Sequence, residues 1–132
     1  MTEFGIMMLA LVAWREARGE GLEGMLAVMC VVRNRVLARW GGWIEVMIQK
    51  NQFHSMIMLG DSQTVLWPTD SSFEAVLKLA HEVHDGRTPD VTDGSLYYAN
   101  MQTATSSWFA KNIATHPDHP KRAEIGKHTF FA

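Results

Sequence analysis

The run from Glu3 to Ala17 constrains the fold most, because nearly every side chain in it is apolar. A helix at the surface of a soluble domain has a broad polar face, and this run lacks one. We therefore expect a helix that is buried on most sides. Gly19 and Gly21 come next in the chain and favour the end of that helix.

The length and composition fit one domain that spans residues 1–132. The chain is 47% hydrophobic, which is enough for a core without disulfides or a metal. Twelve basic and fourteen acidic side chains give a net charge of −2, so nucleic-acid binding is not expected despite the arginines at positions 33, 35 and 39. Cys30, the only cysteine, lies in an apolar stretch and is interpreted as a small buried hydrophobe rather than a nucleophile.

Further helices are predicted in the first two thirds of the chain. The strongest pattern runs from Leu22 to Trp40, where apolar residues recur at spacings of three and four and two glycines follow. The other expected elements are a short helix at Trp43–Gln49, a strand-like piece at Gln52–Met56 and a helix opened by Ser71 or Ser72 that runs to His84.

The C-terminal third predicts a small sheet. Leu96 to Tyr98 and His128 to Phe131 are typical of strands, and Asp93-Gly94 is a turn signal. A short helix at Ser106–Lys111 and a proline-containing loop are expected between them. The sequence thus predicts a mainly helical α+β domain with a small antiparallel sheet, and a cleft between the two parts is the natural place for a site.

Charged residues gather where the apolar helix is expected to end. The segment Trp14-Arg15-Glu16-Ala17-Arg18-Gly19-Glu20 holds two carboxylates and two guanidinium groups. A carboxyl group against apolar surface has its charged form disfavoured, so its pKa rises and it can donate a proton to a leaving oxygen. We interpret Glu16 as such a catalytic acid. The alternative is a structural cluster of ion pairs at a helix end.

Several separated segments together resemble the SleB-type cell wall hydrolases, a family that includes the catalytic domains of spore cortex-lytic enzymes and is found in phage endolysins. No single segment is specific, but they occur here in the family's order and cover nearly the whole chain. They are Glu16-Ala17-Arg18-Gly19-Glu20, then Gly24 and Ala27, Arg33-Asn34-Arg35-Val36, Gln52-Phe53, Asp93 to Asn100, and Gly126 to Phe130.

The resemblance implies a lysozyme-like fold and cleavage of peptidoglycan glycan strands between N-acetylmuramic acid and N-acetylglucosamine. It favours a lytic transglycosylase, which gives 1,6-anhydro products. The resemblance also implies that Glu16, the first residue of the segment Glu16-Ala17-Arg18-Gly19-Glu20, is the catalytic acid. Arg18 and Glu20 would then shape the same helix end. The departures from the common family residues are Asn51, Ser95 and Lys127, which bear on loop details.

The number of catalytic carboxylates separates two possible reactions. A glycoside hydrolase usually needs an acid and a second carboxylate, whereas a lytic transglycosylase uses the substrate's own C6 hydroxyl as nucleophile. Glu20 is the obvious second carboxylate, yet we favour a structural role for it, with Arg18 or Arg15 as its partner. A hydrolytic muramidase remains the alternative. Its other candidates for the second carboxylate, all in expected turns, are Asp61, Asp70 and Asp93.

Aromatic and amide side chains are candidates for binding sugar. Tyr98 and Asn100 should share one face of a strand while Tyr97 lies on the other. Aromatic rings stack on pyranose carbons and amides bond to N-acetyl groups, although core packing is the competing interpretation. Gln52, beside Phe53, is a further candidate at the rim. Two supporting residues are interpreted as structural, Asn34 as a helix anchor and His128 as a satisfied histidine.

No metal or other cofactor is expected. His81 and His84 stand three apart around Glu82, which is one residue short of the spacing in zinc proteases, and His116 and His119 form an equally incomplete pair. An amidase or endopeptidase would need such a metal or an activated cysteine. A third class, a glycan-binding module without catalysis, is disfavoured because binding modules are usually repeated or attached to a partner domain.

The expected partner is the peptidoglycan glycan strand, bound by a monomer without stable insertion into a membrane. The apolar N-terminal run is short, lacks a basic segment before it and leads into charged residues, so it is interpreted neither as a signal peptide nor as a membrane span. We therefore expect a stand-alone domain like a phage endolysin, made in the host cytoplasm and acting on the cell wall after release through a holin.

Overall fold

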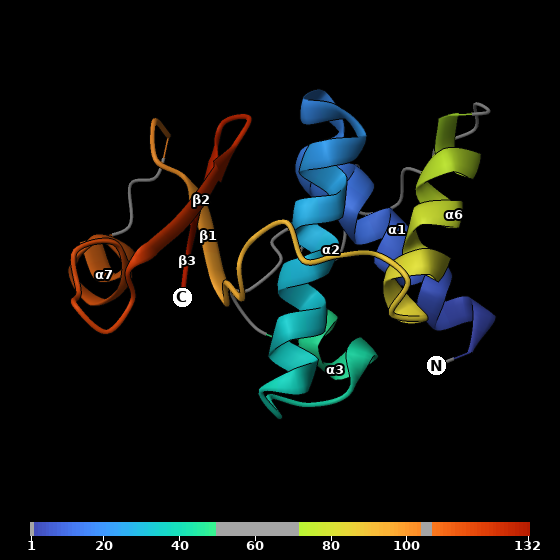
Figure 1. Ribbon diagram of the computed structural model, residues 1–132, viewed down its shortest axis with the longest axis horizontal. Helices are drawn as coiled ribbons and strands as arrows, with labels where there is room; N and C mark the ends of the chain where they lie inside the picture. The colour runs from blue at the N-terminus through green and yellow to red at the C-terminus, as the bar shows by residue number, and fades with distance from the viewer. Residues whose placement is uncertain (1, 50–71, 104–106) are drawn as a thin grey trace.

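A bundle of helices and a small sheet make up the domain, with α2 between the sheet and the other long helices (Figure 1). The computed structural model describes residues 2–49, 72–103 and 107–132. The helical elements are α1 (Glu3–Ala17), the 3₁₀ turn η1 (Arg18–Glu20), α2 (Gly21–Leu37), α3 (Trp43–Ile48), α6 (Ser72–His84), α7 (Ser107–Phe109) and the π-helical turn η2 (Ala110–Ala114).

Helix α1 lies at the centre of the helical part, as its apolar sequence predicts. Leu9, Ala10, Val12 and Ala13 have no exposed surface, and α1 packs against α2, α3 and α6. Thr2 begins the helix, because its side-chain oxygen accepts a hydrogen bond from the Gly5 amide. Burial of this one helix on several sides fixes where its C-terminal end, and therefore Glu16, stands in the fold.

The sheet lies on the other side of α2 (Figure 1). Its antiparallel strands are β1 (Tyr97–Asn100), β2 (Lys121–Ile125) and β3 (His128–Phe131), in the order β1-β3-β2. Ala27 and Val31 of α2 form a second apolar cluster with Phe130 of β3. Because this cluster joins the helices to the sheet, the two parts share a packed boundary.

The predicted helices and strands agree with the structure in most places. The first helix has the expected bounds, and the elements expected at Trp43–Gln49, from Ser72 to His84 and at the C-terminus are present. The strand-like piece at Gln52–Met56 lies outside the described residues. In the described part of the chain, no helix is both long and apolar enough to cross a membrane.

Two features were not predicted. Strand β2 follows directly after Pro120 and is mostly exposed, so its sequence lacks the alternating apolar pattern that marks a half-buried strand. Pairing with β3 stabilises it, through a register that shifts between Lys121 and Ala123. The short helix expected at Ser106–Lys111 is instead a single turn, Ser107–Phe109, that continues as the π-helical turn.

The turn before β1 is anchored to α2 by Asn34. Its amide nitrogen donates hydrogen bonds of 2.9 Å to the Asp90 carboxylate and to the Ser95 carbonyl oxygen. Asp90 also accepts from the Thr92 amide and hydroxyl and from the Gly94 amide. Burial acts to raise the pKa of Asp90, but these hydrogen bonds outweigh it and hold that pKa below its usual value.

We predict that Asp90→Asn destabilises the fold by about 1.5 to 3 kcal/mol at pH 7, because the amide nitrogen would face either the Asn34 and Gly94 donors or the two Thr92 donors. The folded-state pKa of Asp90 is depressed, so its stabilisation is present above the unfolded value of about 4 and is lost as pH falls through the folded value. Urea unfolding between pH 3 and 7 measures this. The difference between the variant and the wild type should shrink toward pH 3.

Asp93→Asn is the matched control, since Asp93 lies in the same turn, is exposed and forms a 3.7 Å surface ion pair with Arg122. Its effect should stay within about 0.5 kcal/mol. Equal stabilities of the two variants at pH 7 would contradict the anchoring role of Asp90.

Candidate active site

Glu16 lies in the last turn of α1, where the helix meets the sheet. Its side chain is partly buried, and it forms a hydrogen bond with the hydroxyl of Tyr98 on β1. Burial raises the pKa of Tyr98 well above its usual value, and the negative charges of Glu16 and Glu20 raise it further. Tyr98 therefore keeps its proton near neutral pH and can donate it to the Glu16 carboxylate.

Tyr98 is held by rings of the neighbouring strand β3. It pairs with Phe130 in the sheet register and stacks on that ring at 5.6 Å between centroids. The His128 ring stands edge-on to Tyr98 at 5.1 Å. Asn100 pairs with His128, so Tyr98 and Asn100 share a face of β1, as the alternation predicts.

Tyr97 faces the other side of β1 and packs against Trp40 and His119, with ring centroids 5.5 and 4.9 Å away. Arg35 stands over the Trp40 ring at 5.0 Å and donates a 2.8 Å hydrogen bond from Nε to the Leu96 carbonyl oxygen. Burial lowers the pKa of Arg35 to about 10, still well above neutral. The sequence analysis named Arg35 but did not place it near the site, because its partner Leu96, just before β1, is 61 residues away in the chain.

Glu20 joins the start of α2 to the turn between β2 and β3. One oxygen accepts a hydrogen bond from the Lys127 amide, and the other accepts one of 2.5 Å from Nδ1 of His128. The expected partner, Arg18 or Arg15, is therefore wrong. Arg18 is exposed and lies over the Trp14 ring at 4.4 Å. Glu20 turns to the hairpin because two donors there, an amide and an imidazole, match its two oxygens.

Gly126 shows how closely Glu20 approaches the hairpin. Its φ of 59° lies in the left-handed region, and a Cβ at this position would come within 2.7 Å of Glu20 Oε1. Gly24 gives Glu20 room from the other side, since a Cβ there would lie 2.6 Å from that of Glu20. Both glycines occur in the segments that carried the family resemblance, and these close contacts explain why a side chain would not fit at either position.

Two further candidates, Asn100 and Asp93, lie at turns. Asn100 accepts a 3.0 Å hydrogen bond from the Gln102 amide, so its side chain stabilises a turn at the end of β1. Asp93 has a φ of 53° and lies in the expected turn. Gln52 and Phe53, expected to bind substrate, lie outside the described residues, as do the two candidate carboxylates Asp61 and Asp70.

Three of the histidines that were considered and rejected as metal ligands have carboxylate neighbours. His81 Nε2 lies 3.1 Å from Glu3, His84 Nδ1 lies 3.0 Å from Asp85, and His116 Nδ1 lies 3.7 Å from Asp118. Among the residues that the structure describes, no three His, Cys, Asp or Glu side chains are arranged to hold a metal ion.

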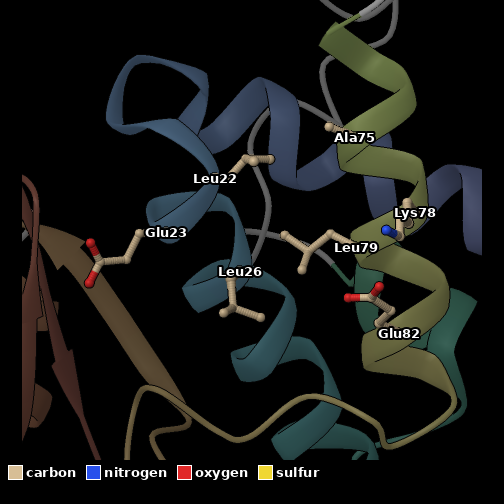
Figure 2. A pocket seen from close by; sticks show the side chains of 7 residues that line it. All are labelled: Leu22, Glu23, Leu26, Ala75, Lys78, Leu79 and Glu82. Carbon is tan, nitrogen blue, oxygen red and sulfur yellow. The ribbon is translucent and has the colours of Figure 1, made fainter.

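An apolar groove of about 380 Å³ lies between α2 and α6 (Figure 2). Leu22 of α2 and Leu79 of α6 extend toward each other across the groove, and the carboxylate of Glu23 points toward the sheet. The lining also includes Glu23, Leu26, Ala75, Lys78 and Glu82. The sheet lies on the opposite side of α2 from this groove (Figure 1), and neither Glu16 nor Tyr98 is among the residues that line it.

A helical domain with a small antiparallel sheet and a carboxylate at their junction has the architecture of a lysozyme-like glycosidase. The fold matches the catalytic domain of the germination-specific lytic transglycosylase SleB from Bacillus anthracis, with a TM-score of 0.77 and 29% identity over 100% of this chain and 97% of that one. The catalytic domain of the Bacillus cereus SleB protein matches with a TM-score of 0.69 and 28% identity, over 100% of this chain and 92% of that one.

Sequence comparison gives the same assignment. The family model described as cell wall hydrolase matches residues 19–131, and the chain belongs to this family. The spore cortex-lytic enzyme of Oceanobacillus iheyensis is 33% identical over 126 residues, which cover 95% of this chain and 40% of that protein. The Bacillus subtilis enzyme of the same name is 32% identical over 95% of this chain and 36% of its own length. The chain thus spans less than half of these relatives.

We predict that Glu20→Gln lowers the free energy of unfolding by about 1 to 3 kcal/mol, because an amide nitrogen would meet one of the two hairpin donors. Its effect on activity should be smaller than that of Glu16→Gln. Urea unfolding and the lytic rate, measured on one preparation, separate the two effects.

The control is Glu23→Gln, an exposed carboxylate three residues further along α2. It should change stability by less than about 0.5 kcal/mol. If Glu20→Gln left stability unchanged and reduced the rate as much as Glu16→Gln does, Glu20 would instead be a second catalytic carboxylate.

Proposed function

We propose that this domain cleaves the glycan strand of peptidoglycan between N-acetylmuramic acid and N-acetylglucosamine as a lytic transglycosylase. The observation that carries the proposal is the Glu16 carboxylate, partly buried at the junction of helices and sheet and hydrogen-bonded by Tyr98. It occurs in a fold that matches a lytic transglycosylase catalytic domain along the whole chain.

In the proposed reaction Glu16 acts first as an acid and then as a base. Its proton passes to the glycosidic oxygen, and the bond from that oxygen to C1 of muramic acid breaks. The C6 hydroxyl oxygen of the same sugar then bonds to C1, and its proton returns to Glu16. No water is consumed, and the product ends in 1,6-anhydro-N-acetylmuramic acid.

Among the candidate carboxylates that lie in the described part of the chain, the environments of Glu20 and Asp93 support one catalytic carboxylate rather than two. Both oxygens of Glu20 accept hydrogen bonds from the hairpin turn. Asp93 lies in a turn beside Arg122. A hydrolytic muramidase would need a second carboxylate about 5 to 10 Å from Glu16 with an oxygen available to the sugar or to water.

The sugar contacts remain predictions. Tyr98 contacts Glu16, Asn100 shares its face of β1, and Tyr97 lies on the other face. All three are proposed to meet the sugar rings and N-acetyl groups. The route to the cell wall, after release from the cytoplasm as in phage endolysins, is likewise a proposal from the sequence.

We predict that Glu16→Gln folds normally and loses lytic activity by about 10² to 10⁴-fold, because the amide keeps the shape but cannot donate the proton. Loss of turbidity of purified cell walls measures the rate, and Glu23→Gln serves as the matched exposed carboxylate. A rate within about threefold of wild type would remove Glu16 from the acid role.

The product of digestion gives a separate test. Mass spectrometry of the released muropeptides should show anhydro ends, each one water lighter than a reducing end. Reducing ends from the earliest time point would make the enzyme a hydrolytic muramidase. Binding to cell walls without release of any fragment would make it a glycan-binding module.

A further inference from the structure

Four polar side chains form a continuous series of contacts from the hairpin turn to Glu16. Glu20 accepts a hydrogen bond from Nδ1 of His128, and the edge of the His128 ring packs against Tyr98. The Tyr98 hydroxyl in turn forms a hydrogen bond with Glu16. The series begins at Glu20 beside α2, crosses β3 and β1 and returns to the end of α1.

Each member of this series is held by further contacts. The side chains of His128 and Glu20 are only 14% and 10% exposed, and the second Glu20 oxygen accepts from the Lys127 amide. Tyr98 stacks on Phe130, which is itself buried against α2. The hydroxyl that meets Glu16 therefore has little freedom to move.

We propose that Tyr98, held by His128 and Glu20, is a positioning residue that fixes the Glu16 carboxyl for both proton transfers and thereby sets the ratio of anhydro to hydrolysed product. This inference rests on the proposed function. A hydroxyl donates a hydrogen bond to a carboxylate and accepts one from a carboxylic acid. The same contact can therefore hold Glu16 before and after it has given up its proton.

The second transfer is the one that depends most on orientation. Glu16 must take the proton from the C6 hydroxyl while that oxygen bonds to C1. If the carboxylate shifts away from the C6 hydroxyl but stays within reach of a water molecule, the water can react instead: its oxygen bonds to C1, its proton goes to Glu16, and a reducing end results. A displacement of about 1 Å at a reacting group can lower a rate by about 10²-fold.

Tyr98→Phe tests the proposal, because it keeps the ring contacts with His128 and Phe130 and removes only the hydroxyl. The expected result is a kcat lowered about tenfold or more, a KM within about twofold, and a larger fraction of reducing ends in the mass spectrum. Thr129→Val, on the opposite face of β3, is the control and should leave the product ratio unchanged.

Two substitutions at His128 test the rest of the series. His128→Phe keeps a ring against Tyr98 but cannot donate to Glu20, whereas His128→Asn offers an amide donor near Nδ1 and removes the ring. Both should raise the fraction of reducing ends, by less than Tyr98→Phe does. Each variant is assayed at a temperature where circular dichroism shows it folded, so that lost stability does not mimic the effect.

An unchanged product ratio and kcat in Tyr98→Phe would overturn the inference while leaving the proposed function intact. A wild type that yields only reducing ends would instead overturn the proposed transglycosylase reaction, whatever the variants do. A changed ratio in Tyr98→Phe with an unchanged ratio in both His128 variants would limit the positioning role to the tyrosine and overturn the part assigned to His128 and Glu20.

Discussion

The site depends on the hydrogen bonds of the Glu20 carboxylate, because they join the start of α2 to the hairpin of β2 and β3. Both of its oxygens accept hydrogen bonds from that hairpin, and glycines on either side leave the space it needs. The apolar cluster of Ala27, Val31 and Phe130 stabilises the same boundary, but hydrophobic contacts do not fix the orientation of the two parts. Directional bonds to a carboxylate fix how the sheet is set against the helices, and that in turn places β1 beside Glu16.

Much of the fold could be predicted because its signals are local. The apolar run from Glu3 to Ala17, with Thr2 before it and glycines after it, carries its own boundaries, and the helix has those bounds. Strand β2 has no such signal, since an exposed strand after a proline is stabilised by its neighbour β3 rather than by its own pattern. The spacing of apolar residues therefore predicts the helical core but does not predict strand β2.

The residues of the candidate site were chosen from the sequence, whereas their contacts were not predicted. Glu16, Glu20, Tyr98 and His128 were each chosen from the sequence, yet the partner expected for Glu20 was an arginine close by in the chain. Its actual partners are more than one hundred residues away, and spacing along the chain does not show which distant residues pair. The Tyr98 hydrogen bond to Glu16 escaped prediction for the same reason, because it joins α1 to a strand eighty residues later.

The same contacts bear on why one carboxylate can suffice in this architecture. A hydrolase would place a second carboxylate where its oxygens reach the sugar or an attacking water. Here Glu20, four residues from Glu16, has both oxygens engaged by the hairpin, and its position holds the strand that carries Tyr98. If the sugar's own hydroxyl is the nucleophile, the reaction does not need a second catalytic carboxylate, and Glu20 can have a structural role instead. The two acidic residues of one short motif then divide the work, one transferring protons and the other holding the surface against which that transfer takes place.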